Sequence, residues 1–321
     1  MQSVTKKRVG ILRGGTGEHY HSSLQKGGDI ISYLRENLSH KYAPVDILID
    51  KDYIWHYAGK PVSPSDLAHK VDVVWNTSHP SFSNILNSLS IPNIGTSSFL
   101  GALQSNRDML NGYVKNIGLN MPRHIVLPLY QKDFDGPRER YAIKKAKQIF
   151  EKFGSPWIVK SFTQDANMGP VRGREGSQRP SASNGMGIHL AKAFPELVRA
   201  IEDGVEHEKS ILVEEFIEGK IASVHSMLGF RNQDIYTFPL GNFSIGEKEM
   251  LTQIAKNLHN HVDAKHYLKS DFVLTPRGKV YLLGIESHPS LKEDSHFSQV
   301  CESVGVKTEH AIEHILEHAL R

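Results

Sequence analysis

The stretch that most constrains the fold lies near the C-terminus, at Ser270–Pro289 (SDFVLTPRGKVYLLGIESHP). Thr275-Pro276-Arg277-Gly278 has the residue types of a tight turn, and apolar runs flank it on both sides, which predicts a β-hairpin. Asp271 opens the first strand and Glu286 lies at the far end of the second, so both carboxylates are expected to reach one point. Carboxylates at one point repel each other unless a cation lies between them, and hard oxygen ligands suit Mg²⁺ that holds nucleotide phosphates. The hairpin therefore predicts a magnesium–nucleotide site.

A simpler interpretation of this hairpin stays open. Lys269 and Lys292 flank the two carboxylates in sequence, so the hairpin end is also compatible with an ordinary salt bridge. A second stretch, Ile211–Lys220 (ILVEEFIEGK), is an apolar strand that runs into Glu214 and Glu215. Taken alone, these two carboxylates are compatible with a solvated strand end as well as with a ligand site.

Length and composition exclude several classes of protein. A chain of 321 residues predicts two or three domains. A net charge of +3 is too small to imply a nucleic-acid or membrane partner, and no segment approaches the ~20 apolar residues of a membrane helix. The single cysteine, Cys301, has no partner for an internal disulfide, which favours a reducing, cytoplasmic location.

The N-terminal part alternates strands with helices. Strands are expected at residues 8–12, 44–49, 71–75 and 91–94, and helices at 21–37 and 82–89. This alternation predicts an α/β domain over residues 1–98, with a small doubly wound parallel sheet. Ser97 and its neighbours resemble the N-cap of a helix over 100–110, followed by a second helix over 110–117.

The remainder of the chain predicts an α+β arrangement with mainly antiparallel strands. Strands are expected at 123–127, 157–159, 185–190, 211–216, 222–230 and 235–239 besides the hairpin, and helices at 141–153, 194–203, 247–262 and 308–320. A polar segment, Thr163–Asn184, interrupts this pattern. On the last helix His310, His314 and His318 recur every four residues, and they are expected on a solvated face.

Six segments together resemble the ATP-grasp superfamily, and most closely the D-alanine–D-alanine ligases. They are Gly14–His19 (GGTGEH), Ile91–Ser97 (IPNIGTS), Trp157–Lys160 (WIVK), Gly185–Ile188 (GMGI), Val213–Gly219 (VEEFIEG) and the hairpin end Glu286–Pro289 (ESHP). Their order and spacing match the family over nearly the whole chain. The resemblance implies an ATP-grasp module over residues 99–321, with a central subdomain at about 121–217 and a C-terminal subdomain at 218–321.

The resemblance also implies the reaction. In such a ligase, ATP with Mg²⁺ (or Mn²⁺) phosphorylates a carboxylate, and an amine then attacks the acyl phosphate to give an amide, ADP and phosphate. The substrates would be amino acids, and with D-alanine the role would be peptidoglycan precursor synthesis for the cell wall. A homodimer is compatible with the resemblance.

Nucleotide-binding roles follow from the resemblance residue by residue. Lys160 and Arg107 would contact the ATP phosphates, and Gly185 and Gly187 lie in a loop that would cover them. The adenine hinge would consist of Glu214, Glu215, Phe216 and Ile217.

Metal-binding and substrate-binding roles follow in the same way. Asp271 and Glu286 would hold the metal, and Lys269 would steady the acyl phosphate. Glu18 would anchor the ammonium group of the first amino acid. Ser295, followed by His296, lies in the segment that contacts the second amino acid.

The sequence departs from the family at several of these positions. Gly284 stands where the family has a bridging glutamate, and Glu286 where it has an asparagine. Ser290 replaces a glycine, Ile221 replaces the glutamate that binds ribose, and the loop at 240–247 is short. The loop Thr163–Asn184 carries three arginines that offer replacement cations, at Arg172, Arg174 and Arg179. Two alternatives therefore stay open: a ligase that joins other amino acids, and a non-catalytic nucleotide-binding protein of the same fold.

Overall fold

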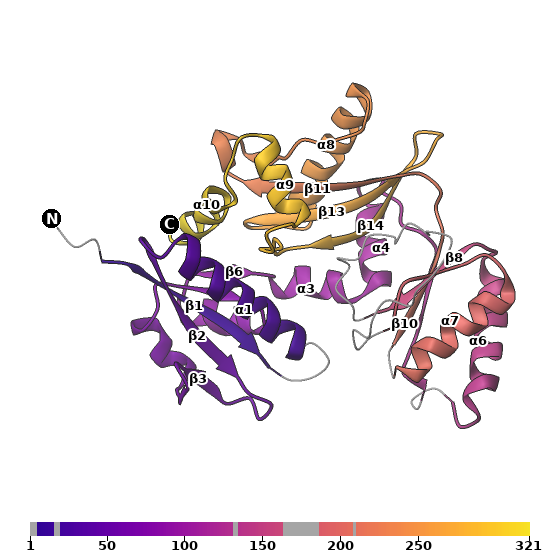
Figure 1. Ribbon diagram of the computed structural model, residues 1–321, viewed down its shortest axis with the longest axis horizontal. Helices are drawn as coiled ribbons and strands as arrows, with labels where there is room; N and C mark the ends of the chain where they lie inside the picture. Colours follow the sequence, from indigo (N-terminus) through magenta and orange to yellow (C-terminus); the bar gives the residue numbers. More distant parts are fainter. Residues whose placement is uncertain (1–4, 16–19, 131–133, 163–185, 208–209) are drawn as a thin grey trace. The chain divides into compact units, whose positions relative to one another are not determined.

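The computed structural model describes residues 5–15, 20–130, 134–162, 186–207 and 210–321. By its internal contacts the chain divides into two compact units. Unit 1 combines Met1–Asn120, Ile221–Phe272 and Leu283–Arg321, and unit 2 combines Met121–Lys220 with Val273–Leu282. Figure 1 labels the elements of both units. The domain boundaries expected near residues 98, 121 and 217 stay predictions.

The N-terminal part of unit 1 is built on a six-stranded sheet. Its strands are β1 (Lys7–Gly14), β2 (Tyr42–Ile49), β3 (Trp55–Tyr57), β4 (Lys60–Pro61), β5 (Val73–Asn76) and β6 (Asn93–Gly95), in the order β4-β3-β2-β1-β5-β6. The four strands β2, β1, β5 and β6 are parallel, as the alternating pattern predicts. The strands β3 and β4, at one end of the sheet, pair in antiparallel fashion and were not expected, because two or three residues are too short to show a period.

Helices connect these strands. They are α1 (Tyr20–Asn37), the 3-10 helix η1 (Pro64–His69) and α2 (Ser81–Ser88). α1 packs on β1 and β2 through Ile30, Ile31 and Leu34. Gly14 ends β1 with a φ of 87°, and a Cβ there would lie 2.2 Å from the carbonyl oxygen of Ile49. Only glycine therefore fits this first turn.

The next two helices are α3 (Ser98–Ser105) and α4 (Arg107–Lys115). The sequence placed the break between them at Leu110, which is wrong by four residues. Asn106 is extended (φ −130°, ψ 103°), and its side chain accepts a hydrogen bond from the backbone N–H of Met109, so it caps α4. Ser97 caps α3 in the same way, as expected.

A second sheet has the strand order β12-β11-β13-β14. Its strands are β11 (Lys220–Leu228), β12 (Ile235–Thr237), β13 (Tyr267–Leu274) and β14 (Val280–Glu286). The helices of this part of the chain are η2 (Phe230–Asn232), α8 (Ile245–His261), α9 (His296–Ser303) and α10 (Thr308–Ala319). The hairpin turn forms where the sequence predicts it, with the N–H of Gly278 donating to the carbonyl of Thr275. The expected start of the first hairpin strand at Asp271 is wrong, since β13 begins at Tyr267. α9 was also not expected.

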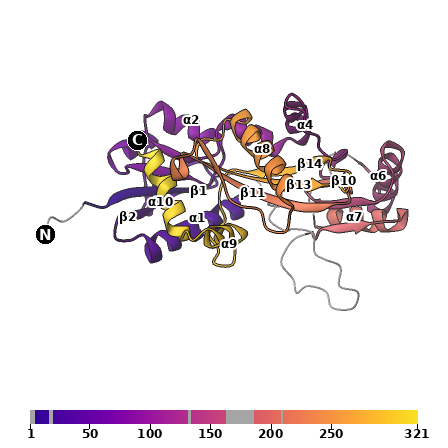
Figure 2. The same ribbon diagram turned by 90° about the horizontal axis from the view of Figure 1, so that it is seen from above.

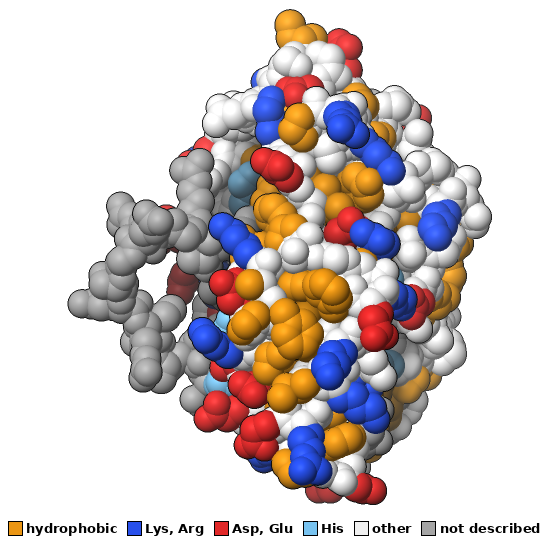
Figure 3. Space-filling view, turned by 90° about the vertical axis from the view of Figure 1, so that its right-hand side faces the viewer, with side chains coloured by type: hydrophobic (Ala, Val, Ile, Leu, Met, Phe, Trp, Pro, Cys, Tyr) orange, Lys and Arg blue, Asp and Glu red, His pale blue; other side chains and the backbone are white. Residues whose placement is uncertain are grey.

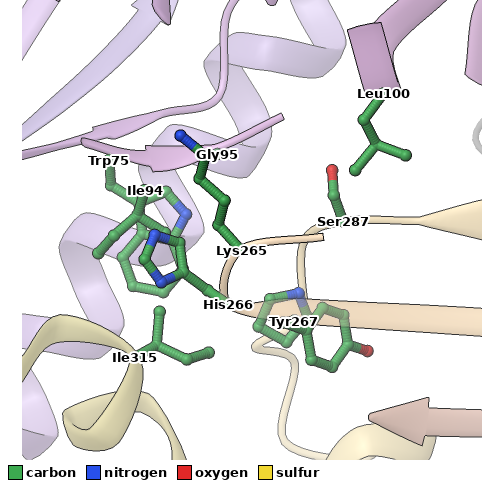
Figure 4. Close-up of a pocket in the computed structure, with 10 residues that line it drawn as sticks. Trp75, Ile94, Gly95, Leu100, Lys265, His266, Tyr267, Ser287 and Ile315 are labelled. Atoms are coloured by element: carbon green, nitrogen blue, oxygen red, sulfur yellow. The ribbon is translucent and has the colours of Figure 1, made fainter. Parts of the chain in front are cut away.

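One hydrophobic core joins the two sheets of unit 1. It combines side chains of β1, α1 and β5 with others from the C-terminal elements, among them Phe238, Tyr267, Phe297 and Ile312. A small cavity of about 10 Å³ lies in this region, with Trp75 of β5, Ile94 of β6, Tyr267 of β13 and Ile315 of α10 around it (Figure 4). Such a volume holds about one water molecule, so it is too small for a nucleotide or an amino acid.

Unit 2 contains a four-stranded antiparallel sheet in the order β7-β10-β8-β9. Its elements are β7 (His124–Leu127), α6 (Arg138–Lys152), β8 (Trp157–Ser161), β9 (His189–Ala191), α7 (Phe194–Glu206) and β10 (Ile211–Glu215). α6 and α7 pack against each other (Figure 2). Their buried side chains share a core with Trp157, Val159 and Val213. The strand expected over 185–190 is shorter and later than predicted.

The face shown in Figure 3 carries hydrophobic side chains in a central band, with Lys and Arg scattered among Asp and Glu around it. Charges of both signs therefore mix on this face. In the described part of the chain, no helix combines the length and apolar character that crossing a membrane requires.

Candidate functional site

One face of the second sheet in unit 1 collects polar side chains. Along β13, Tyr267, Lys269 and Asp271 alternate with the buried residues Leu268, Ser270 and Phe272, so the first three share a face. Neighbouring β11 adds Ser223 and His225, which are also two residues apart. On the other face, the hydroxyl of Ser226 contacts His259 of α8 and Leu268 of β13. Figures 1 and 2 show α8 beside these strands.

Lys269 lies between the two carboxylates that the hairpin predicts to converge. Its Nζ is 3.0 Å from Oδ2 of Asp271 and 3.6 Å from Oε1 of Glu286. All three side chains are largely buried, with 11%, 14% and 20% exposed. Burial by itself lowers the pKa of Lys269, but the two carboxylates outweigh it and the pKa lies above its ordinary value. The structure thus brings the carboxylates to one cation, and that cation is the flanking lysine.

Ser223 completes the contacts of Asp271. Its hydroxyl donates to Oδ1 of Asp271 at 2.5 Å, so each oxygen of this carboxylate has a partner. Ser223 was not among the site residues expected from the sequence. The available signal was the alternation of polar Ser223 and His225 with apolar Ala222 and Val224 in β11.

Asp271 and Glu286 can hold Mg²⁺ only if groups from outside the chain complete its ligands. Among the described residues, no group of three or more His, Cys, Asp or Glu could hold a metal ion. Mg²⁺ that accompanies a nucleotide is usually held by one or two carboxylates, with phosphate oxygens and water as its other ligands. Asp271 and Glu286 supply two hard oxygen donors that already meet at one positive charge. They therefore fit a magnesium ion that arrives with phosphate.

Arg107 is the first residue of α4 and is 7% exposed. Its Nη1 donates to the carbonyl oxygen of Leu283 in β14 at 2.6 Å. In α3, Nε2 of Gln104 likewise approaches the carbonyl of Ile285 at 3.4 Å. These contacts attach the α3–α4 region to β14, the strand that carries Glu286.

In unit 2, the two glutamates at the end of β10 each pair with a basic side chain. Nζ of Lys160 on β8 is 2.8 Å from Oε2 of Glu214, which is 4% exposed. Arg123 holds Glu215 with two hydrogen bonds of 2.9 Å. The Arg123 guanidinium lowers the pKa of Glu215. Glu214 is not a solvated residue at a strand end, because its carboxylate is buried against Lys160.

The other residues expected at the nucleotide are less informative. The backbone N–H of Phe216 donates to the carbonyl of Pro156, and both Phe216 and Ile217 are half-buried. A Cβ at Gly187 would meet only the ring of His189, at 3.9 Å, so packing alone does not require glycine there. Glu18 and Gly185 lie outside the described residues, as does the loop with its three arginines.

Ser295 is the N-cap of α9. Its Oγ accepts a hydrogen bond from the N–H of Ser298 at 3.2 Å and donates to the carbonyl of Ser290 at 2.9 Å. The hydroxyl of Ser295 therefore has a structural role at the start of this helix. Any part that it has in substrate binding stays a prediction.

Three hydrogen-bonded side chains lie beside Lys269, and of these only His296 was expected from the sequence. The hydroxyl of Tyr267 is 2.6 Å from Nδ1 of His225, and Nε2 of His225 is 2.7 Å from Nδ1 of His296. The two imidazoles are stacked, with centroids 4.9 Å apart. Burial, followed by the charges of His296 and Lys269, holds the pKa of His225 well below its ordinary value.

Comparison with known proteins agrees with this architecture. Residues 235–317 match a family model described as the D-ala D-ala ligase C-terminus. A D-alanine–D-alanine ligase from Aquifex aeolicus is 23% identical over 324 residues, with 93% of this chain and 96% of that protein covered.

Solved structures with the same fold include a D-alanine–D-alanine ligase from Bacillus anthracis complexed with ATP. It has a TM-score of 0.66 at 17% identity and covers 98% of this chain and 97% of that one. The VanG D-Ala:D-Ser ligase from Enterococcus faecalis has a TM-score of 0.67 at 16% identity, with 98% and 100% covered. The chain therefore has the same fold as these two ligases. The sequence is similar to that of D-alanine–D-alanine ligases, and residues 235–317 match the C-terminal part of that family.

Proposed function

We propose that this chain is an ATP-dependent ligase that joins two amino acids through an acyl phosphate. The observation that carries the proposal is the cluster of Lys269, Asp271 and Glu286, which lies within the part of the chain that matches the ligase family model. D-alanine is the proposed substrate, as in the relatives' names, and peptidoglycan precursor synthesis in the cytoplasm is the proposed role.

The described residues suit the charge requirements of phosphoryl transfer. Mg²⁺, when bound, would neutralise phosphate charge, and Asp271 and Glu286 would hold it. Lys269 would then be shared between these carboxylates and the acyl phosphate oxygens, which is where a cation is needed as negative charge builds up. Lys160 and Arg107 are proposed to contact the ATP phosphates, as the resemblance implies.

Nucleotide recognition in this proposal involves β10 and the segment after it. Backbone groups at Glu214–Ile217 would meet the adenine edge, and Gly185 and Gly187 would cover the phosphates. Glu18 would bind the ammonium group of the first amino acid, and Ser295 is retained as a contact for the second. A homodimer is part of the proposal.

A second candidate is a ligase of the same fold that joins other amino acids. It is favoured by the structural likeness to a D-Ala:D-Ser ligase, which shows the same architecture in a protein named for a different second substrate. A third candidate, a nucleotide-binding protein without catalysis, is favoured by Gly284, which leaves one expected carboxylate missing.

One assay separates the three candidates. Phosphate release is measured with ATP, Mg²⁺ and D-alanine, and then with a panel of other amino acids. Turnover with D-alanine supports the first candidate, and turnover only with other amino acids supports the second. ATP binding by calorimetry without turnover supports the third. Glu286→Gln should abolish any turnover, because it removes one of two metal-binding carboxylates, whereas Glu249→Gln on the exposed side of α8 should not.

A further inference from the structure

β14, the strand that ends in Glu286, lies at one end of its sheet, and β13 is its only neighbour among the described strands. Carbonyl groups on the outer side of such a strand need donors from elsewhere. Nη1 of Arg107 donates to the carbonyl of Leu283 at 2.6 Å. Nε2 of Gln104 donates to the carbonyl of Ile285 at 3.4 Å. Side chains of α3 and α4 therefore hold β14 on the side that has no neighbouring strand.

The two residues after β14 continue this attachment. Ser287 and His288 directly follow Glu286, the last residue of the strand. The hydroxyl of Ser287 is hydrogen-bonded to the hydroxyl of Thr96, which follows β6. Nε2 of His288 is 2.9 Å from the carbonyl oxygen of Asn76, the last residue of β5. The backbone beside Glu286 is thus fastened to the carboxyl ends of two parallel strands.

The chemistry of these groups fixes the direction of each hydrogen bond. A carbonyl oxygen only accepts, so Nε2 of His288 carries a proton and donates to Asn76. In the neutral ring Nδ1 then has the lone pair, and it accepts from the hydroxyl of Ser287 at 3.3 Å. Ser287 in turn accepts from Thr96 and from Nε2 of Gln104. A hydroxyl has one hydrogen and two lone pairs, so this arrangement uses Ser287 fully.

The groups that take part are shielded from water. Asn76 is 1% exposed, Thr96 6% and Ser287 9%. A bond lost inside such a group leaves its partner without a replacement, because water does not reach it. The arrangement therefore resists any displacement of the backbone next to Glu286.

Asn76 also connects this group to the first turn of the chain. Its Oδ1 accepts from the backbone N–H of Ser78 at 2.9 Å. The hydroxyl of Ser78 donates to the carbonyl of Gly14 at 2.8 Å, and Gly14 is the last residue of β1. Through Asn76 and Ser78, His288 thus joins the end of β14 to the end of β1.

We propose that His288 is a positioning residue for the ligase reaction. It fixes the carboxylate of Glu286, and with it the metal, relative to the turn after β1, where the proposed function places the first amino acid. This inference rests on the proposed ligase function and adds to it a residue that touches neither substrate nor ATP. Ser287 supports His288 by holding its ring through Nδ1.

The reaction makes the position of Glu286 important. A carboxylate of the first amino acid must meet the terminal phosphate of ATP beside the metal, and phosphoryl transfer depends chiefly on positioning and charge. Lys269 and Asp271 lie on β13, which has β11 on one side and β14 on the other, so the sheet itself holds them. Glu286 is at the end of the outer strand, so its position depends on the contacts of Ser287 and His288.

The first test measures metal affinity and requires no turnover. Mg²⁺ is titrated into the ATP-bound protein by calorimetry. His288→Leu removes the donor to Asn76 and should weaken Mg²⁺ binding roughly five- to ten-fold. His288→Gln should recover most of this affinity, because its side-chain amide also offers an N–H to the carbonyl of Asn76. Unchanged Mg²⁺ affinity in His288→Leu would overturn the proposal.

The matched control is Tyr113→Phe. The hydroxyl of Tyr113 on α4 likewise donates to a backbone carbonyl, that of His261 at the end of α8, at 2.8 Å. His288→Leu and Tyr113→Phe each lose one such bond, so both should lower Tm, but only His288→Leu should change the Mg²⁺ affinity. Equal losses of Mg²⁺ affinity would indicate a general loosening of the fold and would contradict the role of His288.

Ser287→Ala is an independent variant that retains the donor of His288. It removes the bond to Nδ1, so Mg²⁺ affinity should fall, by less than in His288→Leu. If His288→Leu does not fold, this variant takes its place, and a Mg²⁺ affinity equal to that of the wild type then contradicts the proposal.

The second test uses the ligase reaction at saturating Mg²⁺. In His288→Leu, kcat should fall roughly ten- to hundred-fold, the range for a small misplacement of reacting groups, with KM for ATP unchanged. His288→Gln should again recover most of the loss. An active wild type whose His288→Leu variant keeps its kcat contradicts the role of His288 and leaves the ligase proposal standing. A wild type that forms no amide with any amino acid contradicts the ligase proposal, and the Mg²⁺ affinities then still support or overturn the positioning of Glu286.

Discussion

At the scale of single residues, the site owes its form to short sequence distances. Lys269 and Asp271 are two residues apart in one strand, and Glu286 is across the hairpin, so turn chemistry and strand periodicity were sufficient to predict that the carboxylates converge. His225 was not predictable in this way. Its partners lie 42 and 71 residues further along the chain, and only the packing of β11 beside β13 and α9 brings them together.

Gly284 offers a direct test of the metal site. A Cβ at this position would meet no atom within 4 Å, and strand periodicity places residue 284 on the face of Glu286. Gly284→Glu should therefore add a third carboxylate at a position with room for its Cβ, and should tighten Mg²⁺ binding in the presence of ATP roughly tenfold. Calorimetric titration of Mg²⁺ into the ATP-bound protein measures this.

The matched control is Gly284→Gln, which has the same size without the charge. Equal Mg²⁺ affinity for the two variants would show that residue 284 does not face the metal and would contradict the proposed site.

At the scale of elements, the long and strongly patterned segments were predictable and the short ones were not. The parallel strands β1, β2 and β5 appear as apolar runs, and α8 is predicted within two residues of its observed start, Ile245. β3, β4 and α9 are too short to establish a period. The break between α3 and α4 depends on the side chain of Asn106, which caps α4 although the apolar pattern continues through it as if through one helix.

The start of α8 provides a prediction for this scale. Ser244 and Glu247 form a capping box, with the Ser244 hydroxyl accepting from the N–H of Glu247 and the Glu247 carboxylate accepting from the N–H of Ser244 at 2.7 Å. Ser244→Ala should lower the free energy of unfolding by about 1 kcal/mol, measured by urea denaturation. Glu249→Ala, an exposed change in the same turn, should cost only a few tenths. Equal losses for the two variants would argue against the cap.

At the scale of the whole molecule, distant parts of the sequence share one core in unit 1. Val9 and Trp75 of the N-terminal sheet belong to the same cluster as Phe297 and Ile312 near the C-terminus. A sequence pattern gives the buried face of each element but not which faces meet, because that choice depends on packing between segments that are far apart in the chain. The ordered motifs of the chain, taken together, predicted the fold that hydrophobic patterns alone do not specify.

Buried histidines should make the stability of the molecule sensitive to acid. Burial lowers the pKa of His259 and of His266 to about 4, and in His266 the nearby His318 adds to the effect. In the unfolded chain both titrate near 6.5, so below that pH the unfolded state binds more protons. The contribution of the two neutral histidines to the free energy of unfolding should be fully present above pH 6.5 and should be lost as the pH falls towards 4. At pH 5 the loss should be about 2 kcal/mol for each histidine.

Thermal unfolding at pH 7.5 and pH 5.0 measures this dependence. His266→Gln should show a smaller fall in Tm between the two pH values than the wild type, whatever its Tm at pH 7.5. His310→Gln, at an exposed position on α10, should retain the full fall. A wild type with the same Tm at both pH values would rule out this role for the buried histidines.

The central claim is that ATP activates a substrate carboxylate as an acyl phosphate, and oxygen transfer tests it most directly. The chain is incubated with ATP, Mg²⁺ and an amino acid whose carboxylate carries ¹⁸O, and the released phosphate is examined by ³¹P NMR. The proposed ligase predicts one ¹⁸O atom in each phosphate, because that oxygen leaves the carboxylate when the amine attacks. Phosphate released without ¹⁸O, in the presence of amide product or without it, would contradict the claim.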